Sequence, residues 1–165
     1  MTSKDREGQA AMLVRRAENV SDQPFLQALF SSVRATPFAA LGLPEPMLET
    51  MMRQQFHAQS TGHQAQYPDA RREIVEADGT AIGRLVSDLG DRRLHLVDIA
   101  LAPDWRGQGL GSVLIGQLQD EAHAAGLAMT LQVARDNPAA NLYARLGFEM
   151  TAADEVYQDM RWTPA

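Results

Sequence analysis

The stretch from Leu94 to Val133 constrains the fold of this chain more than any other part of its sequence. Its first eight residues form a nearly continuous apolar run with β-branched side chains, which predicts a central strand covered on both faces. A glycine-rich turn follows, and apolar residues then recur at helical spacing over about 110–125. A second strand over 127–133 alternates with period two, so the segment predicts a βαβ unit with two parallel strands.

The remaining elements are shorter and surround this unit. Asp78-Gly79 favours a tight turn, which predicts a hairpin of strands over 73–77 and 81–86. The stretch 59–71 has Gly62, Pro68 and no clear periodicity, which predicts a loop. The other expected elements are a strand over 12–17, helices over 22–33 and from Met47 to Phe56, a short helix over 138–146, a strand from Phe148 and a last strand over 156–162.

Composition excludes several classes of protein. The 165 residues carry 21 acidic and 15 basic side chains, a formal charge of -6, which argues against nucleic acid as a partner. The chain has no cysteine, so thiol nucleophiles and disulfides are excluded and a cytoplasmic protein is the default expectation. No apolar run approaches the roughly 20 residues that span a bilayer, so we expect no membrane partner. We expect a disordered leader over 1–10 and a single domain over 11–165.

The glycine turn has the features of an anion site. Glycines at 107, 109 and 111 let the backbone approach a phosphate where a helix begins, and Arg106 adds a cation. A nucleoside-triphosphate loop is excluded because no Gly-Lys-Ser or Gly-Lys-Thr follows. The dinucleotide fingerprint also fails, because Ser112 stands where its third glycine belongs. Taken alone, the glycines could equally make a tight turn beside a solvated arginine.

A second motif, Asn137 to Phe148, follows the second parallel strand and would share the carboxyl end of the sheet with the turn. With both motifs the sequence resembles the GNAT family of N-acetyltransferases over about residues 94–148. The acyl-CoA signature of that family is matched by Arg106, Gly109 and Gly111, and its later pattern by Asn137, Ala140, Tyr143, Gly147 and Phe148. The resemblance implies a mixed α+β, GNAT-like fold: a central mixed sheet of six to seven strands with a splayed parallel pair, and about four helices.

The resemblance also implies a site for acetyl-CoA as the acyl-donor cosubstrate. Pantetheine would bond to main-chain groups of the central strand where it splays, and the pyrophosphate would lie on the glycine turn. The expected cofactor-binding residues are Ile99, Ala100, Leu101, Arg106, Gly107, Gln108, Gly109, Leu110, Gly111, Ser112, Asn137, Ala140 and Tyr143.

Three side chains are candidates for catalysis. Tyr143 occupies the position that the family resemblance assigns to the general acid, although a tyrosine there could also be a packed core aromatic. Two residues are candidates for the general base. His95 has an ordinary pKa that suits proton abstraction. Asp98 is a carboxylate in an apolar strand, and it could instead bind a substrate ammonium or pair within the scaffold. Strand alternation predicts that His95 and Asp98 point to opposite faces.

The sequence therefore predicts an N-acetyltransferase that transfers an acetyl group from acetyl-CoA to a primary amine of a small molecule or peptide by direct attack. The alternative is a non-catalytic acyl-CoA-binding or regulatory module. No metal site is expected, because His57, His63 and His123 have no second ligand at a metal-binding offset. If the protein self-associates, we expect a homodimer.

Overall fold

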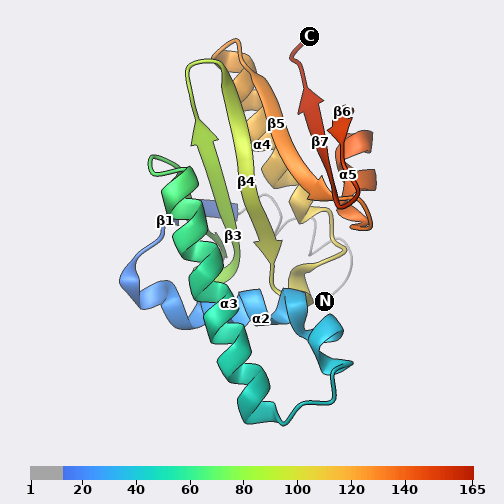
Figure 1. The fold of residues 1–165 in the computed structure, drawn as a ribbon. Coiled ribbons are helices and arrows are strands. Elements are labelled where there is room, and N and C mark those ends of the chain that lie inside the picture. The colour runs from blue at the N-terminus through green and yellow to red at the C-terminus, as the bar shows by residue number, and fades with distance from the viewer. Residues whose placement is uncertain (1–12) are drawn as a thin grey trace.

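The structure is a computed structural model that describes residues 13–165, apart from the side chains of 35–37 (Figure 1). The leader expected over 1–10 lies outside the described residues. Seven strands form one sheet in the order β1-β2-β3-β4-β5-β7-β6. Neighbouring strands are antiparallel except β4 and β5, which run parallel. The predicted mixed sheet with one parallel pair is confirmed, and so is the number of α-helices.

The elements have the following bounds. The strands are β1 (Leu13–Ala17), β2 (Arg71–Ala77), β3 (Thr80–Leu89), β4 (Arg93–Leu101), β5 (Ala128–Ala134), β6 (Glu149–Ala153) and β7 (Tyr157–Trp162). The α-helices are α2 (Gln23–Ala39), α3 (Glu45–Gln66), α4 (Leu110–Ala124) and α5 (Ala139–Arg145). Two 3-10 turns are η1 (Val20–Asp22) and η2 (Pro103–Trp105).

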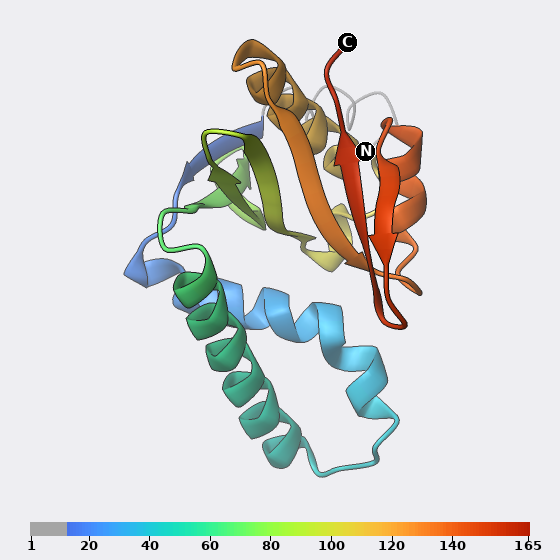
Figure 2. The same cartoon turned by 45° about the horizontal axis from the view of Figure 1, so that its top comes forward.

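Helices cover both faces of the sheet (Figure 2). On one face, α4 and α5 bury the main core, in which Leu114 and Leu118 of α4 pack with Leu94 of β4. On the other face, α2 and α3 enclose a smaller cluster, in which Phe30 and Phe56 lie with ring centroids 5.6 Å apart. Both faces of β4 are therefore under helices, as its nearly continuous apolar sequence predicted.

The predicted loop over 59–71 is wrong, because α3 continues as a helix to Gln66. The first half of α3 packs through the buried side chains of Met52 and Phe56. Most side chains of its last ten residues are exposed, so the sequence there has no apolar stripe that would predict a helix. Alanine and glutamine keep the exposed turns helical, and the helix ends at Gln66, with Tyr67 as its C-cap directly before Pro68. Helix α2 also runs past its expected end at residue 33, because Phe38 packs against the smaller cluster.

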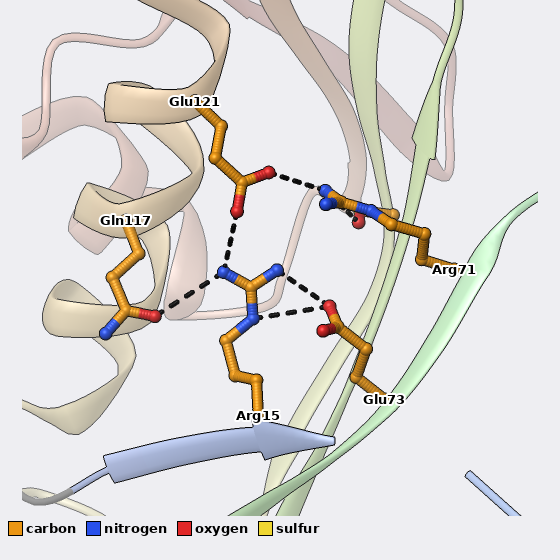
Figure 3. A network of polar contacts seen from close by, with 6 residues as sticks. Arg15, Arg71, Glu73, Gln117 and Glu121 are labelled. Carbon is orange, nitrogen blue, oxygen red and sulfur yellow. Dashed lines mark hydrogen bonds and ion pairs between the residues drawn. The ribbon is translucent and has the colours of Figure 1, made fainter. Parts of the chain in front are cut away.

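An ion-pair network joins the first two strands to α4 (Figure 3). The Arg15 guanidinium donates to the carboxylates of Glu73 at 2.7 Å and Glu121 at 2.9 Å, and Arg71 donates to Glu121 at 2.7 Å. Arg15 also reaches the Gln117 amide oxygen at 3.5 Å. The network fixes the carboxyl-terminal half of α4 against β1 and β2, and so fixes the direction in which its amino-terminal end points.

Candidate active site

The parallel strands β4 and β5 separate partway along their length. Their pairing starts at Arg93 with Ala128 and ends at Leu96 with Leu131. Beyond that pair β4 continues to Leu101, still paired with β3 but, among residues 13–165, with no strand partner on the β5 side. The splayed pair expected from the family resemblance is therefore present, and it exposes a main-chain edge of β4 to any ligand that enters the gap.

A β-bulge lies where the strands separate. On β3, Val86 pairs with Asp98 and Ser87 pairs with Leu96, so Val97 is an extra residue on β4. Asp88 pairs with His95. Since Val86 and Asp88 are two residues apart on β3, their partners Asp98 and His95 point to the same face of the sheet. The predicted placement of these two side chains on opposite faces is wrong, because the bulge inverts the alternation.

The glycine turn leads into the amino-terminal end of α4. Gly107 and Gly109 have φ angles of 71° and 80°, which residues with side chains rarely adopt. The first hydrogen bond of the helix runs from the Val113 N–H to the Gly109 carbonyl at 3.2 Å, so the N–H groups of residues 110–112 have no carbonyl within the helix to donate to. An anion is the natural acceptor for these donors at the positive end of the helix dipole.

Arg106 ties the turn to its surroundings. Its Nε donates to the Leu101 carbonyl at 2.8 Å, and its Nη2 donates to the Ser32 hydroxyl at 3.1 Å. The guanidinium is exposed and keeps further donors for an anion. Arg106 is thus not merely solvated: it joins the end of β4, helix α2 and the turn.

The splayed strands, the glycine turn and α5 enclose one groove of about 950 Å³. It is lined by eleven of the residues expected to bind the cofactor: Ile99, Ala100, Leu101, Arg106, Gly107, Gly109, Leu110, Gly111, Ser112, Asn137 and Tyr143. Two expected residues, Gln108 and Ala140, do not line it, because the Gln108 side chain donates to the Asp104 carbonyl at 2.8 Å and Ala140 packs against the main core. The groove suits acetyl-CoA in size, and it offers the cosubstrate the free amides of the glycine turn and the free edge of β4.

Tyr143 lies on α5 with 7% of its surface exposed. Its ring packs edge-on against Phe148 at 5.9 Å, and its side chain lines the groove. Burial, followed by the negative charge of Asp98, raises the pKa of the Tyr143 phenol to about 12. The hydroxyl therefore holds its proton at neutral pH. The Tyr143 side chain thus packs in the core and also reaches the groove.

Asp98 faces a narrow cavity of about 80 Å³ between β4 and α2. Its Oδ2 lies 3.9 Å from Nη1 of Arg84, and Nε of the same guanidinium lies 3.6 Å from a Glu18 carboxylate oxygen. Burial raises the pKa of the Asp98 carboxyl above its ordinary value, against the opposing charges of Arg84, His63 and Arg34. The cavity shares Val33, Ile99 and Ala100 with the large groove, so this carboxylate lies beside the place where the strands separate.

His95 is held in a different position, further toward the start of β4. Its Nδ1 lies 2.8 Å from the Thr130 hydroxyl, and its ring stacks on Tyr67 with centroids 5.3 Å apart. Burial, followed by the positive charge of Arg93, lowers the pKa of His95 to about 4. The imidazole is therefore neutral at pH 7 and only a weak base.

Sequence reasoning missed Arg84, Val33 and the α3 residues near His95. Arg84 is buried, with 6% of its side chain exposed, and an arginine inside the predicted apolar strand 81–86 was the signal that could have identified it. Val33 and the α3 residues reach the site only through the packing of helices on the sheet, for which the sequence has no local signal.

Among residues 13–165, no three His, Asp or Glu side chains gather as metal ligands would. Over the same residues, no helix combines the length and the apolarity that crossing a membrane requires.

Comparisons with known proteins agree with this geometry. A model of the acetyltransferase (GNAT) family matches residues 41–148, well over half of the chain. Streptothricin acetyltransferase from Streptomyces lavendulae is 34% identical over 103 residues, which cover 59% of this chain and 54% of that relative. The chain thus matches about half the length of this relative.

Two solved structures share the fold. The PaiA N-acetyltransferase from Thermoplasma acidophilum, solved in complex with coenzyme A, has a TM-score of 0.68 and 18% identity, with coverage of 92% of this chain and 99% of that chain. The ribosomal-protein-S18-alanine N-acetyltransferase from Escherichia coli has a TM-score of 0.62 and 20% identity, with coverage of 92% and 94%. At these identities the likeness concerns the fold alone.

Proposed function

The chain belongs to the acetyltransferase (GNAT) family, and from that premise we propose that it transfers an acetyl group from acetyl-CoA directly to a primary amine of a small molecule or peptide. One observation carries this proposal: the free edge of β4, the amides of the glycine turn and the Tyr143 side chain line the same groove. The chain has no cysteine to carry an acyl group, which supports direct transfer.

The groove residues divide into two binding functions. The amides of residues 110–112, with Arg106, bind the pyrophosphate of the cosubstrate, and main-chain groups of Ile99, Ala100 and Leu101 bind its pantetheine arm. Bound acetyl-CoA supplies an activated acetyl thioester. N–H groups near Leu101 donate to the negative charge that develops on the carbonyl oxygen during acyl transfer.

Tyr143 acts as the proton donor of the reaction and Asp98 as its proton acceptor. With a pKa of about 12, the Tyr143 phenol is a proton donor rather than a base, so it acts as the general acid toward the leaving thiolate. Asp98 attracts the acceptor ammonium and, with its raised pKa, is a better proton acceptor than an ordinary aspartate. His95 is less suited to be the base, because burial lowers its pKa to about 4.

The acceptor is a cationic amine in its resting form. An amine with a pKa near that of lysine is mostly protonated at pH 7, and Asp98 offers it a carboxylate. Streptothricin, named in the function of the 34% identical relative, belongs in any panel of acceptors. A cytoplasmic location and a homodimer are further parts of this proposal that remain predictions.

A thiol-release assay with acetyl-CoA and a panel of amines tests the proposed function. We expect release of CoA that depends on the amine and saturates with it. Binding of CoA, seen as a thermal shift, without turnover of any amine would instead favour the non-catalytic acyl-CoA-binding module. The comparisons give that alternative no support.

A further inference from the structure

A second large pocket lies on the α3 face of the sheet, where β4 and β5 begin to separate. Its volume is about 430 Å³, within the range of small-molecule sites. The end of α3 forms one wall, and β4, β5 and β7 form the floor. Its polar lining consists of His63, Gln66, Tyr67, Arg93, His95, Thr130, Gln132, Thr151 and Asp159.

Two polar atoms in this lining are buried and have no hydrogen-bond partner among the described residues. They are Nδ1 of His63, on α3, and Nη1 of Arg93, on β4. Buried polar groups in folded proteins are nearly always paired, and an unpaired one is costly. Both atoms keep unused hydrogen-bonding capacity at the wall of the pocket, which favours a polar over an apolar ligand there.

The pocket presents little net charge, and contacts on two sides hold the His95 ring in it. His95 is fixed between the Tyr67 ring and the Thr130 hydroxyl, and burial keeps both His95 and His63 neutral by lowering their pKa values. The remaining charges are those of Arg93 and Asp159, which are opposite in sign. A fixed, polar and nearly neutral lining suits amide or hydroxyl groups better than a second ammonium.

The pocket lies on the same strand, and on the same face, as Asp98. The bulge at Val97 turns Asp98 and His95 to one side, and their partners Val86 and Asp88 are two residues apart on β3, which puts the two Cα atoms about 7 Å apart. His63 lines this pocket, and the Asp98 carboxylate is near enough to oppose the lowering of its pKa. One extended molecule can therefore reach both.

We propose that this pocket binds the body of the acceptor: a neutral, hydrogen-bonding amide or hydroxyl group about 7 Å from the amine that is acetylated. The inference rests on the proposed function and narrows its substrate class. Simple alkylamines lack such a group and are poor acceptors. The fixed His95 acts here as a positioning residue for the acceptor body, through hydrogen bonding.

Matched acceptors test the pocket. The amines 6-aminohexanamide and n-hexylamine have chains of equal length and differ in the terminal amide. We expect the wild-type protein to show a kcat/KM at least tenfold higher for the amide. A ratio near one would overturn the proposal. Triglycine amide presents the same chemistry as a peptide, and its kcat/KM relative to 6-aminohexanamide separates a peptide acceptor from a small molecule.

Variants of the lining test which residues hold the amide. Thr130→Val removes the partner of His95 at nearly constant volume, and Gln66→Ala changes an exposed side chain on α3 that the fold does not need. Each should reduce the amide preference at least threefold through KM of the amide, while Thr80→Val, on the exposed start of β3, keeps it. An unchanged preference in both lining variants would overturn the proposal.

Calorimetry separates this inference from the proposed function. If neither amine released CoA, the proposed function would fail, and binding of 6-aminohexanamide to the CoA-saturated protein would still report on the pocket. Binding that weakens in Thr130→Val and Gln66→Ala but not in Thr80→Val supports it. No binding, or equal binding by all four proteins, overturns it.

Discussion

Replacing Gly83 by alanine tests how closely β3 holds the part of β4 that walls the groove. Gly83 pairs with Leu101. A Cβ at this position would lie 2.6 Å from the Ala100 carbonyl oxygen and 2.8 Å from Cδ2 of Leu101, distances that real Cβ atoms do not show. The main chain of β4 must therefore move, and Ala100 and Leu101 line the groove.

The magnitude follows from two opposing effects. Overpacking of this kind costs about 1–3 kcal/mol. The alanine also restricts the unfolded chain, which favours the folded state by about 0.4–1 kcal/mol. The free energy of unfolding should fall by about 1–2 kcal/mol, which lowers Tm by about 2–8 °C for a chain of this length. The displaced wall should also weaken CoA binding.

Gly116→Ala is the matched control. Gly116 lies inside α4, and an added Cβ would meet nothing within 4 Å. The same chemical change should therefore stabilise the protein, by up to about 1 kcal/mol, because alanine is the better helix former. Urea unfolding and calorimetric CoA titrations of both variants give the comparison. A Gly83→Ala protein as stable as wild type, with unchanged CoA affinity, would refute the close approach of the two strands.

Three further predictions concern the groove and the fold. Tyr143→Phe should lower kcat by about 10²–10⁴-fold with little change in CoA affinity, measured by thiol release and calorimetry, and equal losses in both would refute its role as acid. Arg106→Gln should weaken CoA binding by about tenfold or more and reduce its dependence on salt, whereas an unchanged affinity would argue that the guanidinium only joins β4 to α2. The hydrogen bond from Arg16 lowers the pKa of Asp22 to about 2 from 3.8, so the pair stabilises the fold above pH 3.8 and loses this effect as the pH falls through about 2. Asp22→Asn should therefore lower the urea midpoint at pH 7, and the gap to wild type should narrow only below pH 3.8; a constant gap would contradict the ion pair.

Patterns of buried residues made much of the fold predictable. The βαβ unit and the hairpin at Asp78-Gly79 occur where the sequence places them, because their apolar periodicity and turn residues act locally. The end of α3 escaped prediction because most of its side chains face solvent, so helical propensity rather than burial keeps it helical.

The groove was more predictable than the surroundings of Asp98 and His95. The glycine turn and the motif around Tyr143 are short and local, and most of their residues line the groove. In contrast, Arg84 meets Asp98, and Tyr67 meets His95, only because distant elements pack together. The extra residue at Val97 is equally invisible to a period-two pattern, which assumes an unbroken strand.

Because of that extra residue, the alternation of side chains between the two faces of the sheet shifts by one position at Val97. Before Val97 one parity of residue numbers faces α3, and after it the other parity does. Deleting Val97 would leave Leu96 opposite Ser87 and Asp98 opposite Val86 in an unbroken ladder, so the Asp98 carboxylate would keep its face and only the bulge would be lost. A set of substitutions designed on one unbroken alternation through β4 would therefore assign every residue after Val97 to the wrong side of the sheet.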